Sequence, residues 1–297
     1  MTVRAANAPT SWGIEPPDRV HDPPWPHVLD EIAEAGYPGI ELGPFGYLPS
    51  SPPQLTAALG ERRLALAAGY VMTPLEAAGG GDDLDAVVRK TCELLSACGS
   101  GNLILMDAVD RERTATAGRT DDARRLDQAG WRRLTDCVLR VAAIAGGEFS
   151  LRVSLHPHVG THVEFEDEVE RVLADVEPAV LGLCPDTGHL TYAGMDPLAV
   201  IARHADRLAY VHLKDIDDER LARARAERQS FDAAVGAGIF RPLGQGCVDF
   251  ASLREALDRL AYNGWVTVEQ DRMPDSSSTP LQEARASLAF LARIGLV

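Results

Sequence analysis

The chain has 297 residues, a length that an α/β barrel can reach as one domain, and its 45% hydrophobic content is enough to build a large core. Its 44 acidic residues against 29 basic ones leave a formal net charge of −15, which repels a phosphate backbone, so nucleic acid is not an expected partner. Small neutral polyols and sugars are compatible with this charge, and a bound metal can reverse the sign of the field locally.

Cysteine spacing and apolar runs bear on the cellular compartment. The five cysteines are an odd number without a C-x-x-C pair, so neither a disulfide framework nor a thiolate zinc site is indicated. The N-terminal segment lacks an apolar signal core, and no uncharged apolar run reaches the length of about 18 residues that a membrane helix needs. We therefore expect a cytoplasmic protein with no membrane partner.

Eight short apolar segments have the character of strands. They are continuous rather than alternating, which is typical of parallel strands that are covered on both faces. These segments are residues 3–9, 39–42, 64–71, 102–106, 151–156, 179–186, 208–214 and 265–270.

Segments with helical periodicity separate the strands, and several of them end in glycine, a common stop after a helix. Strands and helices thus alternate along the chain, which predicts one (β/α)₈ barrel domain over residues 1–297. An open, doubly wound sheet is the alternative. The helical segments include residues 25–36, 82–99, 128–147, 166–176, 196–207, 249–264 and 280–295.

Two longer segments interrupt this alternation. Residues 107–125 follow the fourth strand, and residues 215–247 follow the seventh. Both leave the carboxyl end of a strand, which is the face where barrel enzymes place their active sites. Each segment is expected to be either a lid over that face or a charged, solvated loop.

Polar side chains gather where the last four predicted strands end. In a barrel these ends meet at one mouth, and charged groups that end buried strands need partners or a metal. Imidazole and carboxylate ligands suit Mn²⁺, Mg²⁺, Co²⁺ or Zn²⁺, so we expect one divalent ion whose identity the sequence does not fix. The gathered residues are His156, His158, His162, Asp186, His189, His212, Lys214, Asp215 and Glu269.

Each of these residues also has a purely structural interpretation. Asp186 can ligate a metal or cap the next helix, and His212 can be a ligand or a buried core histidine. His189 can contact substrate or a second metal, or it can bond to the backbone of a turn. Lys214 shares a strand face with His212, where it can bind a substrate oxygen or neutralise Asp215.

Three features nearer the ends of the chain have weaker signals. Glu41 is expected either to hydrogen-bond a substrate hydroxyl or to hold a neighbouring loop. Trp12 is expected either as an apolar wall of the substrate pocket or as a buried tryptophan at the barrel end. The Gly-Gln-Gly segment 244–246 lacks the flanking pattern of a nucleotide-binding loop, so no nucleotide is expected.

An ordered set of motifs identifies a known family. HPHVGTHVE (156–164), PDTGH (185–189), VHLKD (211–215), LGQGCVDF (243–250) and TVEQ (267–270) resemble those of the xylose-isomerase-like superfamily of sugar isomerases and epimerases. APTSWG and GIELGPFGYLP near the N-terminus are similar too, so the resemblance covers nearly the whole chain. Within the superfamily the sequence most closely resembles the inosose dehydratase branch.

The resemblance implies a TIM barrel with one divalent metal held at the ends of strands five to eight. Matching motif to motif gives Asp186, His212 and Glu269 as ligands. The fifth-strand position, a glutamate in many epimerases of the superfamily, is His156 in this sequence, so the fourth ligand is either His156 or Glu164 from the loop that follows.

This departure also bears on the reaction. Epimerases of the superfamily use a pair of metal-associated glutamates, whereas HPHVGT resembles the dehydratase branch, in which a keto-inositol loses water to give a diketone. A metal would polarise the ketone and stabilise the enediolate, while a base removes the α-proton and an acid protonates the leaving hydroxyl. The expected catalytic residues are His158, His189, Lys214 and Glu269, with the base unassigned, and the expected substrate contacts are Trp12, Glu41, His158, His189 and Lys214.

The favoured hypothesis is therefore a lyase acting on a small polyhydroxylated carbonyl compound. A sugar or sugar-phosphate isomerase or epimerase shares the enediolate and differs in where the proton returns. An endonuclease-like hydrolase would need further histidines on early strands and a basic face, which the sequence lacks. A non-catalytic sugar-binding barrel is the remaining hypothesis, and a homo-oligomer is compatible with all of them.

Overall fold

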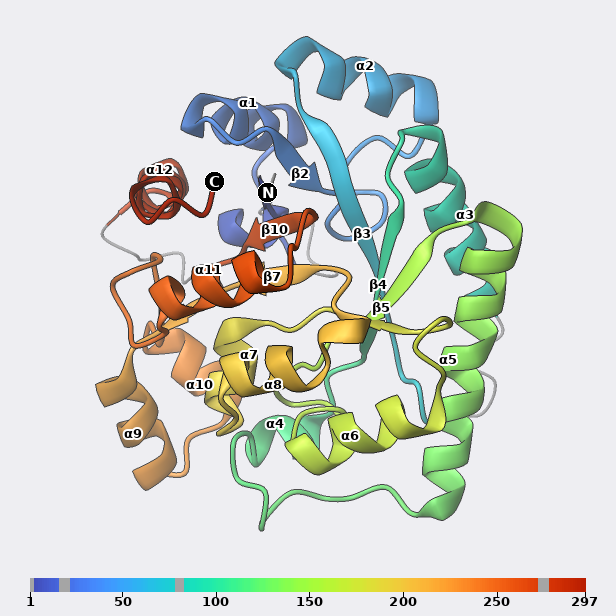
Figure 1. Cartoon of the computed structure of the whole chain (residues 1–297), viewed down its shortest axis with the longest axis vertical. Helices are drawn as coiled ribbons and strands as arrows, with labels where there is room; N and C mark the ends of the chain where they lie inside the picture. Colours follow the sequence, from blue (N-terminus) through green and yellow to red (C-terminus); the bar gives the residue numbers. More distant parts are fainter. Residues whose placement is uncertain (1–2, 16–21, 78–82, 272–277) are drawn as a thin grey trace.

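The computed structural model describes residues 3–15, 22–77, 83–271 and 278–297, and eight parallel strands curl around its centre (Figure 1). Each of the eight predicted segments overlaps one of them, and β3 and β4 extend one or two residues beyond the predicted ends. Hydrogen-bonded neighbours follow the order β6, β5, β4, β3, β2, β1, β10, β7. The strands are β1 (Arg4–Asn7), β2 (Gly39–Glu41), β3 (Ala65–Thr73), β4 (Asn102–Asp107), β5 (Arg152–Leu155), β6 (Gly182–Leu183), β7 (Val211–Leu213) and β10 (Trp265–Val268).

The ring of strands is completed between β6 and β7. Two isolated parallel bridges pair Leu183 with Leu208 and Asp186 with His212. The amides of Ala209 and His212 donate hydrogen bonds to the carbonyls of Leu183 and Pro185, at 3.1 and 3.0 Å. The fold is therefore the expected α/β barrel, and the open, doubly wound sheet is excluded.

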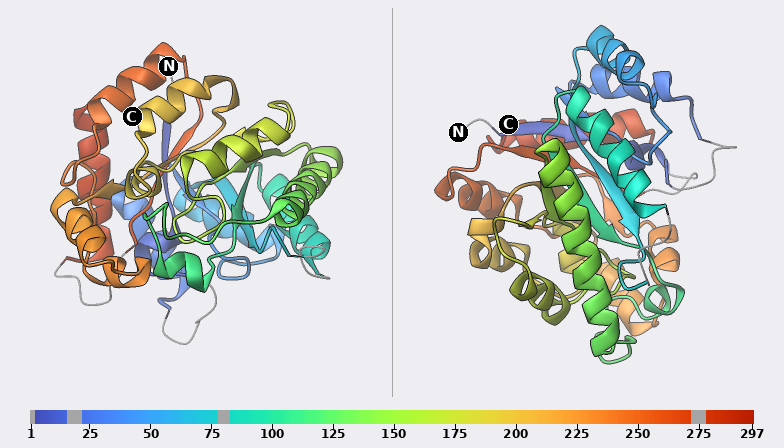
Figure 2. Two further views of the ribbon diagram at one scale, coloured as in Figure 1. Left: turned by 90° about the horizontal axis from the view of Figure 1, so that it is seen from below. Right: turned by 90° about the vertical axis from the view of Figure 1, so that its right-hand side faces the viewer.

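Helices surround the strands, and the described part of the chain has no helix long and apolar enough to cross a membrane. Figure 2 shows α3 and α5 side by side on one flank. The α-helices are α1 (Trp25–Ala35), α2 (Pro52–Arg62), α3 (Leu84–Ala97), α4 (Arg111–Ala115), α5 (Gln128–Phe149), α6 (Glu166–Asp175), α7 (Thr187–Tyr192), α8 (Pro197–Arg203), α9 (Asp218–Ala226), α10 (Phe231–Gly236), α11 (Phe250–Arg259) and α12 (Pro280–Arg293).

Sequence patterns explain where these helices begin, end and pack. Thr279 and Gln282 form a reciprocal capping box at the start of α12. Gly36 ends α1 with φ of 97°, a left-handed conformation that glycine adopts at low cost. Along α5, Leu134, Val138 and Val141 recur at helical spacing and are fully buried in the main core.

The two insertions lie at the same end of the barrel, where α4 packs beside α10 (Figure 1). In the second insertion, β8 (Asp215–Ile216) pairs antiparallel with β9 (Phe240–Arg241). Phe231 and Phe240 lie in a separate buried cluster together with Ala117 of the first insertion. Neither insertion is therefore simply a solvated loop, because each contributes to this small core.

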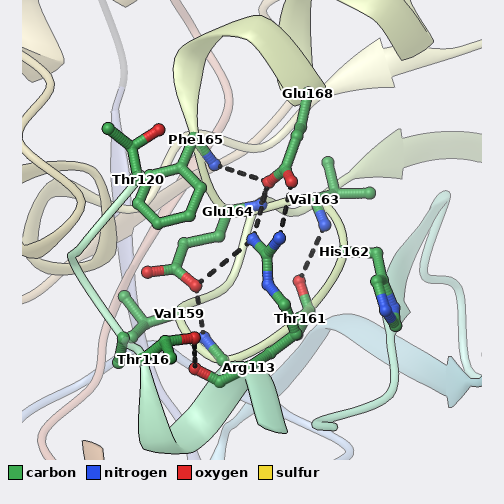
Figure 3. A network of polar contacts seen from close by, with 12 residues as sticks. Arg113, Thr116, Thr120, Val159, Thr161, His162, Val163, Glu164, Phe165 and Glu168 are labelled. Carbon is green, nitrogen blue, oxygen red and sulfur yellow. Dashed lines mark hydrogen bonds and ion pairs between the residues drawn. The ribbon is translucent and has the colours of Figure 1, made fainter. Parts of the chain in front are cut away.

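A buried ion network fixes the first insertion to the loop between β5 and α6 (Figure 3). The guanidinium of Arg113, which has no exposed surface, donates to both carboxylate oxygens of Glu168, at 2.7 and 2.8 Å. Glu164 lies 3.5 Å from the same guanidinium and accepts hydrogen bonds from the amides of Gly118 and Gly160. Arg113 thus compensates two buried carboxylates at once.

We expect Arg113→Met to lower the free energy of unfolding by about 3–5 kcal/mol, because it leaves the buried Glu164 without its cation and Glu168 with only the partly exposed Arg125. Urea denaturation at pH 8 measures the change. Arg203→Met is the matched control, since Arg203 also pairs with two glutamates but is 49% exposed, and it should lower the stability far less. Equal effects of the two substitutions would contradict the role assigned to the buried network.

Candidate active site

Four strand ends bring buried ionisable side chains together around His212. Its Nε2 lies 2.9 Å from Glu41 Oε1, at the end of β2. Its Nδ1 lies 3.3 Å from Glu269 Oε2 and 3.9 Å from Asp186 Oδ2. All four residues are at least nine-tenths buried, and they come from β2, β7 and the segments that follow β6 and β10.

Asp186 has both of the roles that its position suggested. Its Oδ1 accepts the amides of Gly188 and His189, at 2.7 and 2.8 Å, and so caps α7. Its Oδ2 is buried without a hydrogen-bond partner, and so is His212 Nδ1. Unpartnered buried polar atoms cost about 1–3 kcal/mol each, and a cation between these two would give both of them a partner.

His156 joins this group from the end of β5. Its ring centre lies 4.8 Å from that of His212, and its Nδ1 is 3.4 Å from the carbonyl of Cys184. A carbonyl only accepts, so this contact assigns the proton to Nδ1 and leaves Nε2 free to ligate. Potential ligand atoms of His156, Cys184 and His212 lie within 4.8 Å of one another, as do those of Glu41, His212 and Glu269.

Glu164 lies elsewhere, beside Arg113 (Figure 3). Its two carboxylate oxygens accept the amides of Gly118 and Gly160, and burial raises its pKa to about 7. The structure thus brings His156, rather than Glu164, to the group around His212.

His158 and His189 form a close, tilted pair beside the group, with ring centres 3.8 Å apart and planes at 40°. Burial and the charge of Lys214 lower the pKa of His158 to about 4, and burial together with His158 lowers the pKa of His189 well below its usual value. Both imidazoles are therefore neutral at neutral pH and able to accept a proton.

Lys214 is buried among carboxylates. Its Nζ lies 3.1 and 3.2 Å from the two oxygens of Asp271, 3.4 Å from Glu269 and 3.2 Å from Nε2 of His189. Burial opposes its charge, but Asp271, Asp186 and Glu269 together raise its pKa above the usual value. Lys214 is thus held as an ammonium group.

Asp215 is not the partner of Lys214, so that structural alternative is wrong. Its carboxylate instead accepts the amides of Gly244 and Gly246, both at 2.8 Å, and of Val248 at 3.1 Å. The glycine-rich loop therefore surrounds an anion, but that anion is a side chain of the protein. A Cβ at Gly246 would lie 2.4 Å from Asp215 Oδ1, which explains the glycine there.

Trp12 is buried in the main hydrophobic core, and its indole nitrogen donates to Glu31 of α1 at 2.6 Å. Its environment is that of a buried tryptophan at the barrel end.

Two residues that sequence reasoning missed do lie in the site, Asp271 beside Lys214 and Cys184 beside His156. Their spacing could have revealed them. Cys184 is two residues from Asp186 and Asp271 is two residues from Glu269, and residues two apart in an extended segment point to the same side.

Opposing charges set the ionisation of the predicted ligands. Burial raises the pKa of Asp186 to about 6, against the attraction of Lys214 and His212. Burial also opposes ionisation of Glu269, but His212 and Lys214 outweigh it and hold its pKa well below the usual range. Carboxylate, imidazole and ammonium groups in contact at the barrel mouth are the arrangement of an enzyme that moves protons.

A closed parallel barrel with such a group at the carboxyl ends of its strands defines a TIM-barrel enzyme. Comparison with known proteins names the family. The model of the xylose isomerase-like TIM barrel family matches residues 29–294, and the chain belongs to that family.

Two curated relatives and one solved structure show how far the similarity extends. The chain is 33% identical to the rhizopine catabolism protein MocC of Rhizobium meliloti over 306 residues, covering 99% of this chain and 89% of that one. It is 31% identical to the inosose dehydratase of Geobacillus kaustophilus (strain HTA426), covering 90% of this chain and 86% of that one. The IolI protein, solved with a zinc atom, shares the fold with a TM-score of 0.72 at 14% identity, covering 98% of both chains.

The double role of Asp186 makes a prediction for the metal-free protein. Asp186→Asn keeps an oxygen for the amides at the start of α7, whereas Asp186→Ala loses the cap. We expect the alanine variant to be about 0.5–2 kcal/mol less stable than the asparagine variant in urea denaturation with a chelator present. Equal stability would show that the cap contributes nothing.

Proposed function

We propose that this chain is a divalent-metal-dependent lyase that removes water from a small keto-polyol, with a keto-inositol as the substrate of choice. The observation that carries the proposal is the approach of two buried atoms without a hydrogen-bond partner, Asp186 Oδ2 and His212 Nδ1, to 3.9 Å of each other, with Glu269 Oε2 3.3 Å from His212 Nδ1. Similarity to curated inosose dehydratases over nine-tenths of the chain supports the reaction and the substrate class.

His156, Asp186, His212 and Glu269 are the proposed ligands, and this donor set fits Mn²⁺, Mg²⁺, Co²⁺ or Zn²⁺. Burial opposes the proton on His212, but Cys184, Glu269 and Glu41 raise its pKa well above the usual value. The added proton makes the imidazole of His212 a cation among these carboxylates. His212 would have to lose this proton in order to ligate a metal. An ion held by these residues would supply a Lewis acid that polarises the carbonyl group of the substrate.

The imidazole pair supplies the base. His158 and His189 are both neutral at neutral pH because burial lowers their pKa values, so either ring can take the α-proton of the substrate. Lys214, charged and directed among Glu269, Asp271 and His189, is placed to donate a hydrogen bond or a proton to a substrate oxygen. Removal of the α-proton and protonation of the β-hydroxyl release one water and leave an enol, which tautomerises to the diketone.

The second insertion provides an apolar cover for this chemistry. The ring of Phe231 lies 5.9 Å from that of His158 and 5.8 Å from that of His189. Phe240 lies 6.0 Å from His189, and the Nζ of Lys214 is 5.1 Å above its ring. These contacts support a lid role for residues 215–247, because apolar rings over the imidazoles keep water from the enediolate.

Product analysis separates this lyase from an epimerase. We expect Mn²⁺-reconstituted protein to convert 2-keto-myo-inositol with a rise in ultraviolet absorbance, and metal-stripped protein to be inactive. Asp186→Asn should lose at least about 100-fold in turnover, since it replaces a direct ligand and even indirect partners of a metal contribute about 10–100-fold. Asp249→Asn, which changes a similar cap on α11, is the control and should remain active.

Chromatography of ketohexoses under the same conditions tests the alternative. Epimerised ketohexoses, formed without any dehydration of the keto-inositol, would overturn the lyase proposal and favour an epimerase. No turnover and no bound metal in the wild-type protein would favour a non-catalytic barrel.

Lys214 gives a separate prediction. Because general acids contribute roughly 100-fold or more, Lys214→Met should lower kcat by at least about 100-fold while Mn²⁺ binding, followed by electron paramagnetic resonance, is retained. Lys90→Met, on the exposed face of α3, is the control. Unchanged kcat in Lys214→Met would remove Lys214 from the reaction.

A further inference from the structure

A second group of potential metal ligands lies at the end of β4 and on the loops after β3 and β5, apart from the group around His212. It consists of Glu76, Asp107 and His162. The Nδ1 of His162 lies 3.3 Å from Asp107 Oδ2 and 3.8 Å from Glu76 Oε2. The sequence analysis noted His162 among the gathered histidines, but the proposed reaction does not use it.

Two atoms of this group are buried and have no hydrogen-bond partner, His162 Nδ1 and Glu76 Oε2. The side chain of His162 is only 1% exposed, and its ring stands apart from the Arg113 and Glu168 pair (Figure 3). An enclosed imidazole nitrogen directed at two carboxylates is placed to share a cation with them once its proton has moved to the other ring nitrogen.

Asp107 builds the site by joining the loops that carry the other two residues. Its Oδ1 accepts the amide of Leu75 at 2.9 Å, and its Oδ2 accepts the amide of His162 at 2.8 Å. The carbonyl of Glu76 accepts a further bond from Arg133 at 2.6 Å. These bonds fix the backbone beside all three side chains, so the group is preorganised.

The other ring nitrogen of His162, Nε2, lies 3.5 Å from the guanidinium of Arg124. A guanidinium only donates, so this contact assigns the proton of the neutral ring to Nδ1. Cation binding moves that proton to Nε2 and releases Arg124. Arg124 can give up the contact because it is 54% exposed and already pairs with Glu112.

We propose that Glu76, Asp107 and His162 form a second divalent-cation site of the zinc or manganese class, with water completing the coordination. Two ligands at about 2.1 Å from a tetrahedral ion lie about 3.4 Å apart. The separations of His162 Nδ1 from the two carboxylates, 3.3 and 3.8 Å, differ from this value by only a few tenths of an ångström.

An ion at this site would stiffen the loop that carries His158. Within that loop, the amide of His158 donates to the carbonyl of Val163 at 3.1 Å, and the hydroxyl of Thr161 donates to the carbonyl of His158 at 2.8 Å. Holding His162 therefore also holds the backbone of His158. The site is structural and goes beyond the proposed reaction.

Metal stoichiometry tests the site independently of activity. Chelator-stripped protein is titrated with Mn²⁺, with free ion followed by electron paramagnetic resonance and bound metal by elemental analysis. We expect two ions per wild-type chain and one in Asp186→Asn. Adding Glu76→Gln or His162→Gln to Asp186→Asn should weaken the remaining ion by at least about 10-fold. Adding Glu61→Gln, at an exposed carboxylate, should leave it unchanged.

The outcomes distinguish the two sites. One ion in the wild type and none in Asp186→Asn would overturn the second site and leave the first, with His162 serving only as the partner of the carboxylates. One ion in both proteins, lost with Glu76→Gln, would support the second site and overturn the first. An ion that survives both Glu76→Gln and His162→Gln would overturn the assignment of these residues, and circular dichroism verifies that each variant is folded.

Discussion

The site depends on the burial of several carboxylates at the ends of neighbouring strands. Glu41, Asp186, Glu269 and Asp271 are all at least nine-tenths buried, and carboxylates in contact repel one another unless cations accompany them. Lys214 and a protonated His212 balance part of this charge, which is why their pKa values rise despite burial. A divalent ion could replace the proton of His212 and compensate the same carboxylates.

Strand and helix positions could be predicted because they depend on local pattern. Eight apolar segments gave eight strands, whereas the closure between β6 and β7, which excludes the open parallel sheet, had to be seen in the structure. The interior of the insertions could not be predicted in this way. Their small core joins Ala117 to Phe231 and Phe240, a contact between segments more than one hundred residues apart that periodicity does not encode.

The convergence of Asp186, His212 and Glu269 was accessible from the sequence, because strand ends of a barrel meet at one mouth. The directions in which the side chains point could not be predicted from the sequence. The sequence allowed Lys214 to pair with Asp215, but Asp215 turns to the amides of the glycine loop and Lys214 pairs with Asp271 instead. Adjacent residues on a strand face opposite sides, and this geometry separates the two side chains.

The choice between His156 and Glu164 shows how packing resolves what a motif leaves open. Both belong to HPHVGTHVE, and either suits a metal by chemistry. Arg113 of the first insertion needs buried anions, and Glu164 lies beside it with two backbone amides on its carboxylate. His156, by contrast, ends β5 beside His212. Glu164 thus joins the first insertion to the barrel, while His156 lies at the barrel mouth. One short motif therefore contributes both to the packing of the insertion and to the proposed metal site.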